Sequence, residues 1–157
     1  MMEKFTELLA IPNDMELLSY IKESNRWLFR MQSITKSSCC PNCSQRSCQI
    51  HSRYTRHVQD LPIATTPVFF KISLRKWYCT NTKCTTKVFC EQFSWLPKHK
   101  RYTARLETYV KQLAFTTSCL QAEQLCQRAC ILISHDTLLR IIYQTKIEPK
   151  VSPFCGY

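Results

Sequence analysis

The chain has 157 residues and a net charge of +11, from 22 lysines and arginines against 11 aspartates and glutamates. Its single glycine excludes the glycine-rich loops that hold phosphate in nucleotide-binding proteins. Eleven cysteines, no secretory leader and no run of roughly 18 apolar residues argue against a secreted disulfide framework or a membrane protein, so we expect a cytoplasmic location and no membrane partner.

The excess positive charge is concentrated after residue 38. Residues 1–38 hold five basic and five acidic side chains, whereas the rest of the chain holds 17 basic and 6 acidic ones. A segment with this balance favours a polyanionic partner, because clustered lysines and arginines neutralise phosphates. The alternative is a basic domain that binds no nucleic acid.

Residues 15–36 show the alternation that is typical of a pair of strands. Trp27, Phe29 and Met31 alternate with Arg30 and Gln32, and the pattern breaks near residues 23–25. We therefore expect a β-hairpin inside an N-terminal lead-in that comprises residues 1–38.

Two short cysteine motifs follow this hairpin. Cys40 and Cys43 are separated by two residues, and Cys79 and Cys84 by four. Such spacing lets both sulfurs of a pair point at one metal ion, and four thiolates complete the tetrahedral shell of structural zinc. The sequence therefore predicts a zinc site formed by these four cysteines. Three cysteines near the motifs are alternative ligands whose roles stay open, namely Cys39, Cys48 and Cys90.

Strand patterns fill the segment between the two motifs. We expect a strand over residues 50–58 and a stronger one over residues 68–74, where large apolar side chains occupy every second position. A short strand near residues 88–89 completes a small β-rich, zinc-ribbon-like domain over residues 39–96.

Two polar residues of this domain have competing interpretations. His51 is an alternative metal ligand, but the complete cysteine set favours a structural or DNA-facing role. Asp60 precedes Leu61 and Pro62 in a segment, residues 61–64, that we expect to form a turn. Since aspartate side chains commonly bond to turn backbone, we expect Asp60 to cap this turn and to take no part in catalysis.

From residue 98 onward the apolar period becomes helical. Three apolar stripes predict three short helices in a helix-turn-helix domain over residues 97–146, so the expected fold class is α+β. The stripes consist of Leu106, Tyr109, Val110, Leu113 and Ala114, then of Leu120, Leu125 and nearby cysteines, and then of Leu138, Ile141 and Ile142. Ser134 is the expected N-cap of the last helix, with Asp136 in its first turn. The alternative is a three-helix packing unit that touches no nucleic acid.

Basic and polar side chains of these two domains are the predicted DNA contacts. Arg140 is the strongest candidate for contact with a base edge, since a guanidinium forms two hydrogen bonds with guanine. The full set is His135, Thr137, Arg140 and Gln144 on the last helix, Lys98, Lys100, Arg101 and Arg105 before or at the start of the first helix, and Arg53 and Arg56 on the first long strand. For the two strand residues, a solvated face is an equal alternative.

Six short motifs occur in order along residues 40–145. They are Cys40-Pro41-x-Cys43, His51-Ser52-Arg53-Tyr54-Thr55-Arg56, Asp60-Leu61-Pro62, Arg75-x-Trp77-x-Cys79-x-Asn81-x-x-Cys84, Phe89-x-Glu91 and Ser134-His135-Asp136-Thr137-Leu138-Leu139-Arg140. In order and spacing they resemble the N-terminal zinc-finger and helix-turn-helix part of ISL-three-type bacterial insertion-sequence transposases. The resemblance implies a zinc-dependent module that binds double-stranded DNA at the terminal inverted repeats of a mobile element during DNA transposition and recombination.

Members of that family continue into a nuclease domain in which three carboxylates bind the metal ions of strand cleavage. In this chain Glu148 is the one acidic residue after Asp136, and residues 147–157 are expected to form a C-terminal tail. Because two-metal cleavage needs several convergent carboxylates, we expect a truncated transposase without enzyme activity. The expected protein partners are a second copy of the chain or a full-length transposase.

Two other functions are alternatives to this interpretation. A free-standing zinc-ribbon and helix-turn-helix transcriptional regulator would share the metal and the basic surface, but it would bind an operator near a promoter. An enzyme with a reactive cysteine, such as Cys48 or Cys90 paired with His51, is disfavoured because no third orienting group can be identified.

Overall fold

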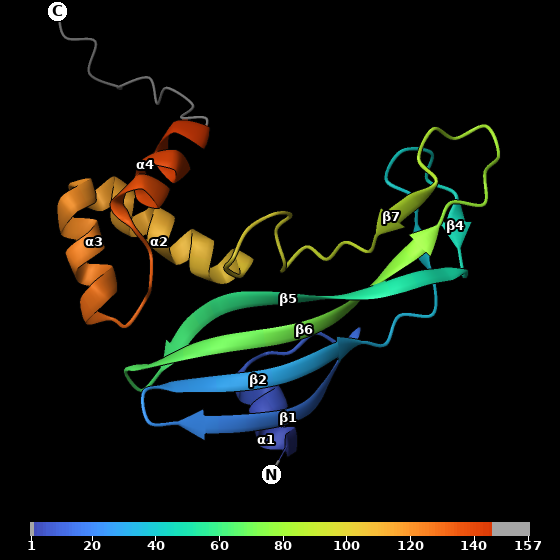
Figure 1. Ribbon diagram of the computed structural model, residues 1–157. Coiled ribbons are helices and arrows are strands. Elements are labelled where there is room, and N and C mark those ends of the chain that lie inside the picture. Colours follow the sequence, from blue (N-terminus) through green and yellow to red (C-terminus); the bar gives the residue numbers. More distant parts are fainter. Residues whose placement is uncertain (1, 146–157) are drawn as a thin grey trace, which may run out of the picture.

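The computed structural model describes residues 2–145. They form a mixed α+β structure, in which a sheet-rich N-terminal part precedes three consecutive helices (Figure 1). The helices are α1 (Met2–Leu8), α2 (Ala104–Thr116), α3 (Cys119–Arg128) and α4 (His135–Gln144). The strands are β1 (Met15–Glu23), β2 (Arg26–Ser33), β3 (Ser38–Cys39), β4 (Arg46–Ser47), β5 (Ile50–Ile63), β6 (Thr66–Tyr78) and β7 (Val88–Cys90). The expected α+β class is confirmed.

The main sheet joins segments that lie far apart in the sequence. Its strand order is β1-β2-β6-β5, with β7 paired to β6 as well. The expected N-terminal hairpin is present as β1 and β2, which pair antiparallel. β2 then runs parallel to β6, with Phe29 beside Phe70. The hairpin is therefore a continuous part of the sheet that β5 and β6 form.

One face of this sheet carries the main hydrophobic core. The residues of β6 that the sequence placed inside are buried, namely Val68, Phe70, Ile72 and Leu74. The residues between them point to the opposite face, because successive side chains of a strand alternate. Side chains of α1, of the segment around Leu9 and Ile11, and of the segment around Leu96 cover the core.

The expected turn over residues 61–64 is wrong in its position. β5 continues to Ile63, and the turn lies at Ala64 and Thr65, both of which have positive φ. Pro62 is compatible with the strand because the pairing of β5 with β6 is irregular at this point. Proline is tolerated at such irregularities, where no backbone N–H is needed for the ladder.

Three helices occupy the region where the sequence predicted them, but the apolar stripe expected for α3 is only partly right, because its two leucines are exposed while Cys126, one of its cysteines, is buried. Leu120 and Leu125 are 60% and 39% exposed, whereas Ala122 and Cys126 are fully buried. Small side chains therefore form the contact surface of α3. The first of these three helices, α2, begins only at Ala104. The N-terminal helix α1 is not predicted from the sequence.

The three C-terminal helices begin at hydroxyl-bearing N-caps. Thr103 caps α2, Ser118 caps α3 and Ser134 caps α4, each by accepting a hydrogen bond from a backbone N–H in the first turn. The predicted cap at Ser134 and the position of Asp136 in the first turn of α4 are confirmed. No helix within residues 2–145 has the length and apolar character needed to cross a membrane.

Gln59 of β5 connects the sheet to the helical part. Its backbone accepts from the N–H of Thr103 at 3.0 Å and donates to the carbonyl of Arg101 at 2.8 Å. Its side-chain amide donates to the carbonyl of Cys130 at 3.2 Å and accepts from the N–H of Leu132 at 3.0 Å. One side chain of the sheet thus fixes the loop between α3 and α4.

Asp60 does not cap a turn, contrary to the expectation from the sequence. Its carboxylate is completely buried and accepts a hydrogen bond from Thr103 Oγ1 at 2.6 Å. The guanidinium of Arg105 donates to both carboxylate oxygens, and the Nε contact measures 2.8 Å. Hydrogen bonding to Asp60 raises the pKa of Arg105 above its ordinary value. The pair fastens the start of α2 to the sheet.

Candidate metal centre and nucleic-acid interface

The first cysteine motif lies in a tight loop between the paired strands β3 and β4. The N–H of Cys40 donates to the carbonyl of Gln45 at 2.9 Å, and the N–H of Ser44 donates to the carbonyl of Cys40 at 2.8 Å. Ser44 has a φ of 60°, in the left-handed region, which turns the chain back directly after Cys43. The loop brings the sulfurs of Cys40 and Cys43 together.

The second motif follows β6 directly. The N–H of Cys79 donates to the carbonyl of Lys87 at 2.8 Å, and the N–H of Cys84 donates to the carbonyl of Asn81 at 3.1 Å. The side-chain oxygen of Asn81 also accepts from the N–H of Lys83 at 3.0 Å, the local bond that favours asparagine in turns. This loop places its two sulfurs against those of the first motif.

The four sulfurs have the spacing of a tetrahedral metal site. The Sγ atoms of Cys40, Cys43, Cys79 and Cys84 all lie within 4.8 Å of one another. The Sγ atoms are 4.0 Å apart for Cys40 and Cys84, and 3.6 Å apart for Cys43 and Cys79. Zinc–sulfur bonds of about 2.3 Å require sulfurs about 3.8 Å apart, whereas a disulfide requires about 2.05 Å. The donors and their spacing therefore fit zinc.

The thiols of the cluster differ in how readily they ionise. Burial raises the pKa of Cys79, the backbone of Asn81 opposes this effect, and the neighbouring sulfurs raise the pKa further, to about 12. Burial also raises the pKa of Cys84, but hydrogen bonds from the backbone of Thr86 and the side chain of Asn42 lower it to about 7. A dication bound between the four sulfurs would supply the positive charge that lets all of them ionise together.

Apolar side chains enclose the cluster on one side. Trp77 is completely buried and packs with Phe89 against the cysteines. Asn42, which is not one of the four candidate ligands, donates a hydrogen bond from its side-chain amide to Cys84 Sγ at 3.4 Å. Outer contacts of this kind orient metal ligands and limit the access of water.

The alternative ligands lie outside the cluster. Cys39, Cys48 and Cys90 are exposed and none of them joins the four convergent sulfurs. His51 is exposed as well, and its Nδ1 lies 2.8 Å from the hydroxyl of Ser52. Within residues 2–145, the four cysteines are the one group of three or more histidine, cysteine, aspartate or glutamate side chains that converge closely enough for a metal.

Comparison with known families supports this interpretation of the cysteines. Residues 36–84 match the family described as the zinc-finger of transposase IS204/IS1001/IS1096/IS1165. The matched segment contains both cysteine motifs and the four convergent sulfurs. No curated protein and no solved structure gives a significant match to the chain. Residues 36–84 are therefore similar to a transposase zinc ribbon and contain a candidate metal site.

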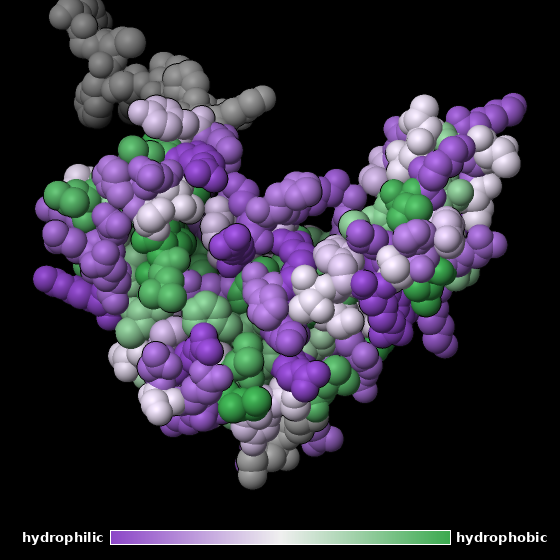
Figure 2. Space-filling view, viewed as in Figure 1, coloured by the Kyte–Doolittle hydropathy of each residue, from purple (hydrophilic) through white to green (hydrophobic). Residues whose placement is uncertain are grey.

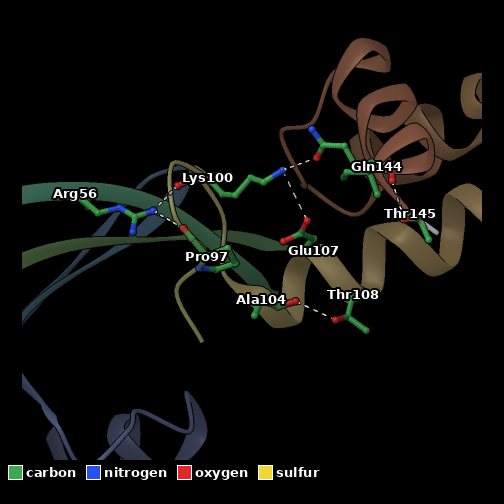
Figure 3. A network of polar contacts seen from close by, with 9 residues as sticks. Arg56, Pro97, Lys100, Ala104, Glu107, Thr108, Gln144 and Thr145 are labelled. Atoms are coloured by element: carbon green, nitrogen blue, oxygen red, sulfur yellow. Dashed lines mark hydrogen bonds and ion pairs between the residues drawn. The ribbon is translucent and has the colours of Figure 1, made fainter. Parts of the chain in front are cut away.

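The two predicted DNA contacts on β5 point to opposite faces of the strand. Arg53 is exposed. Arg56 donates from Nη2 to the carbonyl of Pro97 at 2.9 Å and to that of Lys100 at 2.7 Å, so it holds the segment before α2 (Figure 3). Contact of Arg56 with DNA stays a prediction, whereas its role in the fold is visible.

The predicted contacts before α2 also fall into two groups. Lys98 and Arg101 are exposed. Lys100 reaches from its loop toward two helices: its Nζ is 3.1 Å from the side-chain oxygen of Gln144 and 3.9 Å from a carboxylate oxygen of Glu107 (Figure 3). Lys100 and Gln144, both predicted DNA contacts, therefore join the loop to α4.

Helix α4 presents a mixed surface. Arg140 is exposed on the side away from the buried stripe, as expected. His135 and Thr137 are half-buried near the start of the helix. The N–H of His135 donates to a carboxylate oxygen of Glu123 at 3.1 Å, and the N–H of Thr137 donates to the capping hydroxyl of Ser134 at 3.4 Å. Arg140 is thus the accessible cation of this helix.

The surface is hollowed between the helical part and the cysteine loops (Figure 2). A groove of about 490 Å³ lies beside the metal site, and Arg56, Lys98 and His99 are among the residues that line it. Tyr54 lines the groove as well. Its pKa is raised to about 12, first by burial and then by the charge and the hydrogen bond of Cys90. Basic side chains therefore stand between the metal centre and the start of α2.

Proposed function

We propose that this chain is the zinc-dependent DNA-binding part of an insertion-sequence transposase and that it recognises the terminal inverted repeats of a mobile element. The observation that carries the proposal is the convergence of four cysteine sulfurs inside a segment that matches a transposase zinc finger. The net charge of +11 supports a polyanionic partner, since lysines and arginines act on phosphates.

The proposal assigns DNA contacts to two domains. The zinc-ribbon domain, residues 39–96, contributes the metal centre, and residues 97–146 act as a helix-turn-helix domain. In this arrangement α4 enters the major groove and Arg140 contacts a base edge. The bond network of Gln59 supports this role, because it fixes the loop that precedes α4.

We propose binding without strand cleavage for these residues. Two-metal cleavage requires several carboxylates at one place. Two buried carboxylates of the chain have structural partners instead: Asp60 binds Arg105, and Glu91 accepts from Ser33 Oγ at 2.9 Å and from Thr35 Oγ1 at 2.8 Å. The candidate metal group of residues 2–145 consists of cysteines alone, which favours structural zinc.

Binding of the zinc-loaded chain to duplexes with terminal repeats tests the proposal. For about 6 phosphate contacts, the slope of log affinity against log salt should be near −5. The strands should stay intact in magnesium or manganese, and added chain should lower excision by a full-length relative in proportion to its concentration. A flat salt response would remove nucleic acid as the main partner, and metal-dependent cleavage would contradict the absence of catalysis.

A free-standing transcriptional regulator is the second candidate. The exposed position of Arg140 on α4 suits an operator as well as a terminal repeat. The same titration separates the two functions when a promoter duplex is included as a competitor. Preference for terminal repeats supports the transposase, and preference for the promoter duplex supports the regulator.

A further inference from the structure

The face of the sheet opposite the core carries a row of basic side chains. In the strand register Arg30 of β2 lies beside Lys71 of β6, and Lys71 lies beside His57 of β5. Arg30 and Lys71 each follow a buried aromatic residue, Phe29 and Phe70, so the alternation of the strands directs them away from the core. All three members of this basic row are exposed.

The basic row has no acidic partner among residues 2–145. The ion pairs in this part of the chain join Arg26 to Glu23, Lys100 to Glu107 and Arg105 to Asp60. Glu16 of β1 lies on the same face, but its carboxylate already accepts from the side-chain amide of Gln32 at 2.6 Å. Like charges directly opposite each other destabilise a pair of strands. The basic row therefore adds no stability to the sheet by itself.

We propose that the basic row binds the phosphate backbone of DNA, at a surface separate from α4. This inference rests on the proposed DNA-binding function. Neighbouring strands are about 4.8 Å apart, so the outer Cα atoms of the row are about 10 Å apart, a span that brings long side chains to successive phosphates. Ser73 and Thr55, the next residues of β6 and β5 on this face, are short and leave the row accessible.

Charge complementarity identifies DNA as the occupant. Arg30 and Lys71 supply two positive charges and His57 adds an imidazole that can donate a hydrogen bond, so the row suits phosphate contact rather than the reading of base edges. Arg53, exposed on the same face of β5, extends the positive charge along the strand. The row is therefore expected to add affinity equally for all DNA sequences.

A pair of charge-matched double variants tests the basic row. Arg30→Gln with Lys71→Gln removes two charges from the row. Lys4→Gln with Lys22→Gln removes two exposed charges elsewhere, because Lys4 lies on α1 and Lys22 lies over the ring of Trp27 at 5.1 Å. Titration of both proteins with specific and unrelated duplexes, at several salt concentrations, reports their affinities. Thermal unfolding of each variant shows that the fold is retained.

The row variant should bind both duplexes about tenfold more weakly, and its salt slope should be smaller in magnitude by about 2, since each lost phosphate contact removes about 0.9. The control should keep the slope of the parent. Equal effects of the two variants, or unchanged affinity of the row variant, would overturn the inference and make an acidic protein the better occupant. Failure of the parent to bind DNA would instead refute the proposed function and the inference together.

Chemical modification of the unaltered chain gives a second measurement that does not depend on variants. Bound DNA should protect Lys71 from an amine-reactive reagent but leave Lys4 reactive, because Lys4 belongs to the helix that covers the opposite face. Equal reactivity of Lys71 with and without bound DNA would contradict the proposed surface.

Discussion

The carboxylate of Asp60 joins β5 to the first turn of α2. It accepts from the hydroxyl that caps α2, Thr103, and from the guanidinium of Arg105. Both partners lie more than 40 positions away in the sequence, which local pattern reasoning does not reach. The turn-capping role was expected for Asp60 because aspartate before a proline-containing segment usually acts locally, and here a long-range pair outweighs that tendency.

Asp60→Asn should destabilise the protein by about 2 kcal/mol, because it removes the charge that pairs with Arg105 while keeping the size of the side chain. Urea unfolding followed by circular dichroism measures the change. Asp136→Asn is the matched control, since Asp136 is exposed and its loss should cost less than about 1 kcal/mol. Equal stability of Asp60→Asn and the parent would show that the buried pair contributes nothing to the fold.

The cysteines contrast with Asp60, because the sequence predicts their arrangement. Two motifs with short spacing leave few ways to place two sulfurs on one metal, and the structure brings that same set of four together. Cys39, the neighbour of Cys40, was an alternative metal ligand, but it belongs to β3 and is exposed. The two-residue spacing of Cys40 and Cys43 therefore identifies the cysteine that joins the cluster.

At the scale of elements, local patterns predicted β6, the N-terminal hairpin and the cap of α4. The parallel pairing of β2 with β6 was not predictable in this way, because it depends on which hydrophobic faces meet after the chain folds. The same limit explains α3, where exposed Leu120 and buried Ala122 reverse the usual preference. Packing against α2 and α4 selects small side chains there, and an isolated helical pattern does not show its neighbours.

The loop between α3 and α4 depends on an element outside the helical part. Gln59→Leu should remove the part-buried hydrogen bonds to the N–H of Leu132 and to the carbonyl of Cys130, at a cost of about 0.5–1.5 kcal/mol for each bond. Hydrogen exchange of the amide of Leu132 should become faster, and specific DNA affinity should fall more than non-specific affinity. Gln124→Leu, at an exposed position of α3, is the control. Unchanged exchange at Leu132 would refute this role of Gln59.

At the scale of the whole molecule, the sheet supports two separate structures. The helices α2–α4 gather near one end of β5 and β6, and the cysteine loops lie near the other end (Figure 1). Each has its own buried cluster: Leu106, Val110 and Leu138 belong to that of the helices, and Trp77 and Phe89 to that of the metal centre. Stability at the two ends is therefore expected to respond differently to loss of metal.

Removal of zinc by a chelator should unfold the cysteine loops while the helices stay folded. Structural zinc supplies about 10 kcal/mol or more of apparent folding free energy in small modules, and here the ion would join the two cysteine loops through all four sulfurs. Hydrogen exchange should show lost protection over residues 38–48 and 79–90, with protection retained over residues 104–144. DNA affinity should fall in the same titration, because one of the two proposed contact domains is lost.

Two cysteine variants separate loss of metal from other effects of the chelator. Cys43→Ser removes one of the four convergent sulfurs and should reproduce the exchange pattern of the chelated protein, with less than one zinc per chain by metal analysis. Cys48→Ser should keep full zinc and parental exchange, because Cys48 is exposed and lies outside the cluster. If the helices lose protection together with the loops, the molecule unfolds as one unit and the separation of the two clusters is wrong. If Cys43→Ser keeps full zinc and the parental exchange pattern, the assignment of Cys43 as a ligand is wrong instead.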